Sequence, residues 1–385
     1  MKYILPLIFM DIFLLPMFHV LGAPFKFSFI YLIIWYIVKR PFNRMLMPVM
    51  GLIIALWLGK IMSYFIYDMH SFDQTMFMTL NYGVIFIGFA YGLRYSPKKM
   101  NWLFTLIILF VLINIVIMIF WRSSPNLIRF YNLEFRLESG LFDYRNPGTL
   151  SNPNGSAMAL NLLLLFWVIA KQYKLIDLSN AIYDMLLFIL GFIVIVSFGS
   201  KSGFLAYFII LGYAFRDYLK QNAIKVFMVV IVAVVAVTTL TSYVQNKNIG
   251  SFETGISTFF SLDDKIQNEF SKDNSLDGSR IYKLKHALES WLRSPIWGFG
   301  ADRSASNSIQ SIQYHNDGSE ILVNSGSIGL FLFALIVLRI FKIHPILIVP
   351  FIFPGMTNSF FFTAQYAMCH FIMVGIFYQA KTNRK

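Results

Sequence analysis

The stretch NWLFTLIILFVLINIVIMIFW, residues 101–121, decides the fold class of this protein. It contains no charged residue, and about 20 apolar residues in an α-helix cross a hydrocarbon core of ~30 Å. Similar runs recur along a chain of 385 residues that is 57% hydrophobic and only 13% charged. This composition lies well outside that of soluble domains. The sequence therefore predicts an all-α polytopic membrane protein with a single transmembrane domain over residues 1–385.

The apolar runs divide into about twelve predicted transmembrane helices that leave two long connections between them. These connections, 122–156 and 244–325, are predicted to be extracytoplasmic and partly helical, whereas the other connections are short. No small-residue cleavage site follows the first run, which is therefore predicted to be a retained helix. The predicted spans are 3–21, 23–38, 45–67, 75–93, 101–121, 157–171, 180–198, 203–215, 226–243, 326–341, 345–361 and 364–380.

Lysine and arginine cluster in alternate connections, which gives the predicted orientation. Short cytoplasmic connections are enriched in these two residues, so the pattern predicts that the N-terminus and the C-terminus are both cytoplasmic. The basic residues assigned to the inner side are Lys2, Lys39, Arg40, Arg44, Arg94, Lys98, Lys99, Lys171, Lys174, Arg216, Lys220, Lys225, Arg339, Lys342, Lys381, Arg384 and Lys385.

Charge and cysteine content exclude several classes of function. The net charge is +13, but the basic residues punctuate apolar segments instead of forming one stripe, so nucleic acid is not an expected partner. The single cysteine, Cys369, lies inside an apolar run, which excludes a disulfide framework and a cysteine-based metal site. The HExxH pattern is also absent, and no metal or cofactor is expected.

Arginines in the two long outer segments are not required by the orientation rule. Arginine can bind phosphate through two parallel hydrogen bonds. The alternative is that these residues only balance the acids of the same segments, since isolated surface charges contribute little. The arginines are Arg122, Arg129, Arg136, Arg145, Arg280, Arg293 and Arg303.

Turn and helix signals organise both outer segments. The Asn-Pro pairs at 146–147 and 152–153 predict a tightly turning loop that feeds a helix starting near Ser156. Residues 256–270 carry apolar residues at near-helical spacing and predict an amphipathic helix on the membrane surface.

A second helix is predicted after Ser279, a plausible N-cap, and ends at Pro295. Arg280 then lies in its first turn, where free backbone N–H groups and the helix dipole favour an anion. Arg280 is therefore a candidate phosphate ligand.

The stretch YHNDGSEILVNSGSIG, residues 314–329, places a histidine directly before a predicted helix. Asp317 followed three residues later by Glu320 resembles a capping box with Asp317 as the N-cap. The positive potential of that helix start favours a neutral imidazole at His315, which can accept a proton. His315 is a candidate general base, or alternatively an ordinary loop histidine. His70, and His286 if it only faces water, are predicted to tolerate alanine.

Four motifs in this order resemble the O-antigen polymerase and O-antigen ligase family of bacterial inner-membrane glycosyltransferases. They are RLESGLF with NPNGSAMAL, then FGSKSGFLA, then SRIYKLKHALESWLRSPIWGFGA, then HNDGSEILVNSGSIGLF, between about residues 136 and 331. Family members often carry Ser-Arg-Gly where this chain has Ser200-Lys201-Ser202-Gly203; lysine keeps the charge but loses the bidentate geometry of arginine.

The resemblance implies a metal-independent transfer of glycan from undecaprenyl pyrophosphate. His315 would activate the acceptor hydroxyl, and Arg280 and Lys201 would bind the pyrophosphate. Further candidate contacts to pyrophosphate or glycan are Arg136, Arg145, Asn316 and Glu320. The implied partners are the undecaprenyl-pyrophosphate-linked glycan, membrane lipid and, as a candidate, a chain-length regulator protein.

Three alternatives stay open at this point. The resemblance favours a polymerase, which would transfer the growing glycan to the non-reducing sugar of another lipid-linked repeat unit. A ligase would differ only in its acceptor, the lipid A core. A polysaccharide or lipid transporter would place ionisable residues at the midplane, where the candidates are Asp11, Lys60 and Asp184. An intramembrane serine protease with Ser202 as nucleophile would need a histidine from an outer loop.

Overall fold

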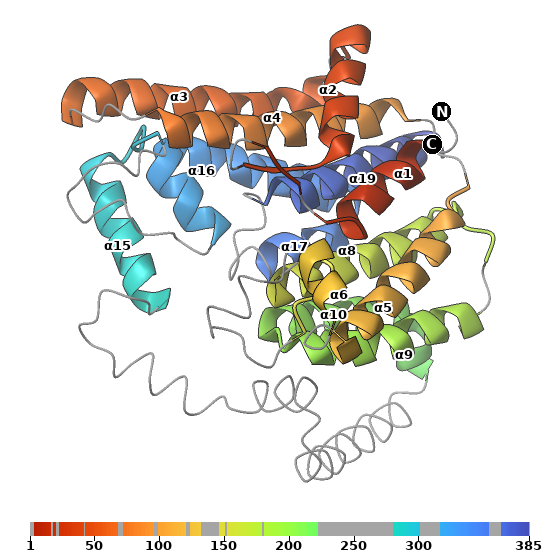
Figure 1. The fold of residues 1–385 in the computed structure, drawn as a ribbon. Coiled ribbons are helices and arrows are strands. Elements are labelled where there is room, and N and C mark those ends of the chain that lie inside the picture. The colour runs from red at the N-terminus through yellow and green to blue at the C-terminus, as the bar shows by residue number, and fades with distance from the viewer. Residues whose placement is uncertain are drawn as a thin grey trace. The chain divides into compact units, whose positions relative to one another are not determined.

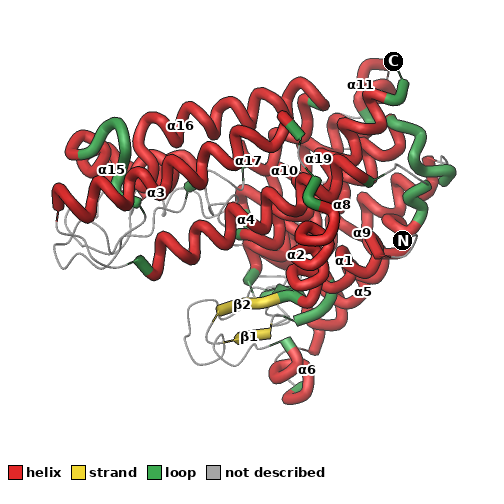
Figure 2. The backbone as a smooth tube through the Cα atoms, turned by 90° about the horizontal axis from the view of Figure 1, so that it is seen from above, coloured by secondary structure: helices red, strands yellow, loops and turns green. Residues whose placement is uncertain are grey.

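The computed structural model describes residues 4–16, 18–20, 23–41, 43–67, 72–95, 99–120, 124–131, 146–150, 152–178, 181–221, 280–300, 316–353 and 363–384. These residues are mainly helical, with one hairpin of two short strands (Figures 1 and 2). The chain divides into two compact units, which are described separately. The first comprises Met1–Phe25 and Lys99–Leu262, and the second Lys26–Lys98 and Asp263–Lys385.

Among the described residues, five helices are long and apolar enough to cross a membrane. They are Arg44–Ile66, Asp73–Arg94, Trp102–Phe120, Pro153–Gln172 and Asp317–Ile343. Each overlaps one of the predicted spans, and shorter apolar helices accompany them. The protein is a multi-pass helical membrane protein, as predicted; a total of twelve spans stays a prediction, and the span 226–243 lies outside the described residues.

The first unit contains seven of the described helices and the hairpin. They are α1 (Ile4–Phe13), α5 (Trp102–Phe120), α6 (Pro125–Phe130), α8 (Pro153–Gln172), α9 (Ala181–Phe198), α10 (Lys201–Ala214) and α11 (Arg216–Gln221), and the strands are β1 (Phe18–Val20) and β2 (Ala23–Phe25).

The hairpin corrects the first two predicted spans. β1 pairs antiparallel with β2, and Phe18 lies opposite Phe25 (Figure 2). The prediction of continuous helices over 3–21 and 23–38 is therefore wrong in this stretch. An apolar run can form a buried helix or a strand, and here Pro16 and Pro24 disfavour the helix because proline removes a backbone donor from a helix interior.

Helix α8 is the buried centre of the first unit. It packs against α5, α9 and α10, and nearly all of its residues are buried. Asn152 is its N-cap, with the side-chain oxygen accepting from Asn154 N at 3.0 Å, and Pro153 occupies the first turn, where no N–H donor is needed. The predicted start near Ser156 is therefore too late.

The first Asn-Pro pair forms a turn inside the first unit. Asn146 is fully buried, and its amide nitrogen donates to Asn114 O and to Ser197 Oγ, both at 3.1 Å. Thr149 Oγ1 donates to Phe13 O at 3.0 Å. This end of the predicted outer segment 122–156 thus packs against α1, α5 and α9.

The second unit is built around a group of long helices. Its elements are α2 (Phe27–Lys39), the 3₁₀ helix η1 (Arg44–Leu46), α3 (Met47–Tyr67), α4 (Asp73–Arg94), α15 (Arg280–Arg293), α16 (Asp317–Ile343), the 3₁₀ helix η2 (Pro345–Ile348), α17 (Val349–Ile352) and α19 (Ala364–Thr382). Helix α4 packs against α2, α3 and α19, and α16 packs against α3 and α15 (Figure 1).

A helix spanning 345–361 is not found in the described part of this stretch. The short helices η2 and α17 occupy its start, and residues 354–362 lie outside the described residues. Pro345 and Pro350 each occupy the first turn of one of these helices, which is the position that proline tolerates. The eleventh predicted span is therefore corrected over this part.

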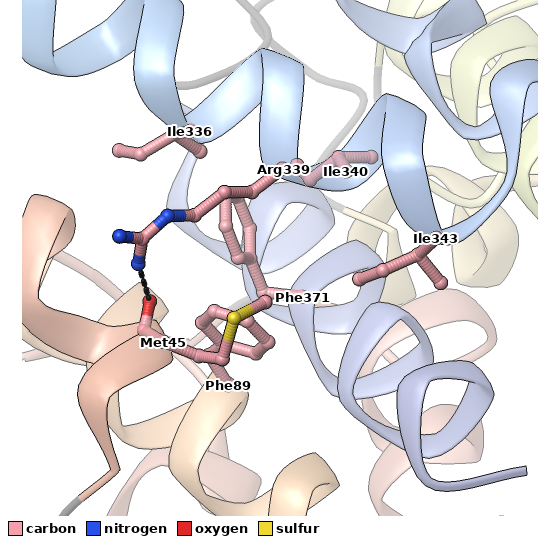
Figure 3. A pocket seen from close by; sticks show the side chains of 7 residues that line it. All are labelled: Met45, Phe89, Ile336, Arg339, Ile340, Ile343 and Phe371. Carbon is pink, nitrogen blue, oxygen red and sulfur yellow. Dashed lines mark hydrogen bonds between the residues drawn. The ribbon is translucent and has the colours of Figure 1, made fainter. Parts of the chain in front are cut away.

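One end of the second unit is basic. Arg339 of α16 donates to Arg44 O at 3.0 Å and to Met45 O at 3.5 Å, beside a small pocket that Phe89 and Phe371 help to line (Figure 3). The basic residues at this end, where α3 begins and α4, α16 and α19 end, are Arg44, Arg94, Arg339, Lys342 and Lys381. All of them were assigned to the cytoplasmic side by sequence.

Candidate functional site

Helix α16 is broken within its first half, and the break defines the candidate site. Gly326 has φ 60° and ψ −161°, a backbone conformation that is essentially restricted to glycine. An unbroken helix would join Ser327 N to Val323 O and Ile328 N to Asn324 O. Gly326 interrupts this pattern, so these four groups need other partners.

The segment 294–300, SPIWGFG, supplies those partners. Phe299 N donates to Val323 O and Gly300 N to Asn324 O, both at 2.8 Å. Ser327 N donates to Pro295 O at 2.9 Å, and Ile328 N to Ile296 O at 3.5 Å. The segment, which follows α15, therefore completes the backbone hydrogen bonding of a helix that crosses apolar surroundings, as a membrane requires.

Side chains reinforce this attachment. Ser327 Oγ donates to Pro295 O at 2.8 Å. The indole nitrogen of Trp291 donates to Ser327 Oγ at 3.1 Å and to Pro295 O at 3.0 Å. Helix α15 is thereby held in a fixed place against α16.

Gly300 is the point where α3, α4 and α16 come together. Besides its bond to Asn324, its carbonyl accepts from Thr75 Oγ1 of α4. A Cβ at Gly300 would lie 2.3 Å from the Lys60 Cα, and its φ of +68° favours glycine. Lys60 is completely buried, and its Nζ lies 4.9 Å from the centroid of the Phe72 ring. This buried lysine in an apolar helix therefore borders the candidate site.

Asn316, not Asp317, is the N-cap of α16. The Asn316 side chain accepts from Ser319 N at 2.7 Å, so the predicted capping box of Asp317 and Glu320 is wrong by one residue. Asparagine and aspartate are equally good N-caps, and the sequence Asn-Asp offers both. Asp317 is then the first helical residue, where its negative charge still interacts favourably with the positive end of the helix dipole.

Asp317 and Glu320 point inward despite their charge. Their exposed fractions are 2% and 3%, and both carboxylates lie near enough to the Tyr82 hydroxyl of α4 to interact with it electrostatically. Buried carboxylates are costly in an apolar environment. We call Lys60, Thr75, Tyr82, Asp317, Glu320 and Asn324 the polar end of the second unit; it lies opposite the basic end along α3, α4 and α16.

Arg280 is the first residue of α15 and so lies in its first turn, as predicted, but its side chain and the predicted N-cap Ser279 lie outside what the structure describes. His286 of the same helix does not simply face water: it is buried, and its Nδ1 lies 3.5 Å from Ser290 Oγ. Burial lowers the pKa of His286, and Arg293 adds to this effect while Glu289 opposes it.

Lys201 belongs to the first unit. It is the half-buried first residue of α10, whose N-cap Ser200 accepts from Gly203 N at 3.3 Å. Asn161 of α8 donates to Gly203 O at 2.7 Å. The FGSKSGFLA motif therefore forms a capped helix start held against α8.

Several predicted site residues lie outside the described residues, namely His315, Arg136 and Arg145, as does the predicted surface helix 256–270. Among the described residues, no group of three or more His, Cys, Asp or Glu side chains is placed to hold a metal ion. Tyr82 and Asn324 were not predicted from sequence. Polar residues inside apolar runs, such as Asn81-Tyr82 and Asn324-Ser325, are the signal that could have found them.

Comparison with known proteins agrees with the motifs. A family model described as O-antigen ligase matches residues 186–334, which include most of α9, all of α10 and α15, and the broken half of α16. A search of curated proteins gives no match to the chain. Arg136 and Arg145 precede the matched residues, whereas Lys201, Arg280, His315 and Glu320 lie within them. Residues 186–334 of this chain are therefore similar to the O-antigen ligase family.

Proposed function

We propose that this protein is a surface polysaccharide polymerase of the bacterial inner membrane. It transfers a growing glycan from undecaprenyl pyrophosphate to the non-reducing sugar of another lipid-linked repeat unit. The observation that carries the proposal is the family match over 186–334, because this region contains the buried polar residues of α16 and the helix starts at Lys201 and Arg280. A function of the O-antigen polymerase or ligase type follows from the match; the polymerase assignment is the finer proposal.

The reaction needs a base and a stabilised leaving group. The acceptor hydroxyl oxygen attacks the anomeric carbon, the bond from that carbon to the pyrophosphate oxygen breaks, and His315 accepts the hydroxyl proton. Arg280 and Lys201 offset the charge that develops on the pyrophosphate. Arg136 and Arg145 are proposed as further contacts to the lipid-linked substrate, and Asn316 and Glu320 as contacts to glycan.

Ligation to the lipid A core is the second candidate, and the description of the matched family favours it. Its chemistry at the anomeric carbon is the same, so the same base and cations would serve. A transporter is less well supported. One of its three intramembrane candidates, Asp184, pairs with Lys171 and accepts from Trp167 Nε1 at 2.7 Å, which is a structural role.

The deciding experiment gives the purified protein lipid-linked repeat units, either alone or together with lipid A core. A polymerase converts repeat units alone into a ladder of longer lipid-linked chains. A ligase needs the lipid A core and leaves repeat units alone unchanged. If neither mixture yields a new glycosidic bond with an active, folded preparation, the proposed function is wrong.

A further inference from the structure

One face of α16 carries three buried polar side chains. Asp317, Glu320 and Asn324 are spaced by three and four residues, which places them on the same side of a helix. Their exposed fractions are 2%, 3% and 6%. Tyr82 of α4 is completely buried and interacts electrostatically with both carboxylates. The face is therefore turned toward the interior of the polar end.

The amide nitrogen of Asn324 is the unusual member of this face. It is buried, and Nδ2 has no hydrogen-bond partner among the residues that the structure describes, although the backbone carbonyl of the same residue accepts from Gly300 N. The Cα–Cβ bonds of a helix tilt toward its N-terminus, so this side chain leans toward the turn that holds Glu320. A buried donor without a partner lowers stability, and a ligand that accepts a hydrogen bond there would compensate.

We propose that Asp317, Glu320 and Asn324 form the subsite that binds hydroxyl groups of the acceptor sugar. A sugar hydroxyl can donate to a carboxylate and accept from an amide N–H at the same time, which matches this pair of chemistries. The two carboxylates would repel the pyrophosphate of the donor, so the face suits the sugar hydroxyls of the acceptor better than the leaving group. This inference rests on the proposed glycan transfer.

The test uses an acceptor that cannot serve as donor. The probe is the repeat-unit oligosaccharide released from its lipid pyrophosphate, titrated against purified full-length protein with lipid-linked repeats as donor. Asn324→Leu should raise the half-saturating concentration of this oligosaccharide about five-fold, the effect of losing one neutral hydrogen bond. With the free oligosaccharide at a saturating concentration, the half-saturating concentration of the lipid-linked donor should stay unchanged.

Stability separates binding from a structural role. Because Asn324 Nδ2 has no partner in the described part of the chain, the similarly sized leucine should keep or raise the Tm. As a matched control, Asn114→Leu removes an amide that does hydrogen bond, to Phe110 O at 2.7 Å and to Thr149 N at 3.1 Å. It should lower the Tm and leave the half-saturating oligosaccharide concentration unchanged.

Glu320→Gln provides a second, independent measurement. It preserves size but removes the charged acceptor, and should raise the half-saturating oligosaccharide concentration about ten-fold. Binding is also measured without turnover, since at one fixed concentration the oligosaccharide should raise the Tm of the wild type more than that of either variant.

The outcomes distinguish the two proposals. If the half-saturating oligosaccharide concentration is unchanged in both variants while the wild type is active, the proposed subsite is wrong and the proposed glycan transfer is unaffected. If Asn324→Leu lowers the Tm and leaves the half-saturating oligosaccharide concentration unchanged, Asn324 has a structural role and the proposed subsite is also wrong. A wild type that neither makes product nor is stabilised by the oligosaccharide overturns both.

Discussion

A general base at His315 should contribute roughly 10²–10⁴ in rate, while leaving substrate binding to the cationic groups. His315→Ala should therefore be membrane-inserted and folded but make no long chains. His315→Gln should not rescue it, since an amide forms hydrogen bonds but does not accept a proton at neutral pH. The measurement is polymer formed by purified variants at matched Tm. Product within a few-fold of wild type would exclude His315 as the base.

If Arg280 and Lys201 bind the pyrophosphate, substitutions at these two residues should have unequal effects on product formation. Arg280→Ala should abolish or strongly reduce product, and Arg280→Lys should restore only part of it, because lysine lacks the paired donors of guanidinium. Lys201→Arg should be tolerated. Product chains are compared by gel at equal protein levels. Wild-type product from Arg280→Ala would remove Arg280 from the site.

At the scale of elements, the break in α16 depends on Gly326. Alanine there would hold a strained backbone conformation, and its Cβ would lie 2.2 Å from Ile296 O. Gly326→Ala should therefore lower stability by about 2 kcal/mol or more, seen as a fall in Tm. The control is Gly83→Ala in α4, where a Cβ meets nothing within 4 Å. Alanine there should raise the free energy of unfolding by at most ~1 kcal/mol. Equal Tm for the two variants would mean that the attachment of 294–300 does not stabilise α16.

The buried histidine of α15 makes stability depend on pH. The folded-state pKa of His286 lies below its ordinary value of 6.5 because of burial, so below that value the unfolded chain binds more protons than the folded one. The stability of the protein should therefore fall as pH drops from about 7 to about 5. His286→Gln should flatten this part of the curve in thermal unfolding. An identical pH dependence in the variant would assign the effect to other groups.

The sequence predicted the type of an element correctly where the length and composition of a run allow only one structure. The predictions were wrong where local chemistry decides between similar possibilities. The run 101–121 contains no charge and is α5 over nearly its whole length. By contrast, Asn316 and Asp317 are equally suited to cap α16, so only the observed bond to Ser319 N distinguishes them. The partnership of 294–300 with α16 joins backbone atoms distant in sequence, which no residue pattern specifies.

At the scale of the whole molecule, the positions of lysine and arginine predict a cytoplasmic basic end and an extracytoplasmic site. A cysteine at Asn248 or at Ser306 should react with an impermeant maleimide added outside, and a cysteine at Lys98 should not. The native Cys369 is buried, so it should give little background. The reverse labelling pattern would place the site in the compartment without its substrate.

The attachment of 294–300 to α16 also bears on how the protein is made. A membrane helix normally leaves the translocation machinery with its backbone bonds complete within itself. Here the carbonyls of Val323 and Asn324 bond to residues synthesised earlier. The broken form of α16 therefore has these backbone groups satisfied only when the upstream segment has docked, so the break in the helix and the docking of 294–300 form together.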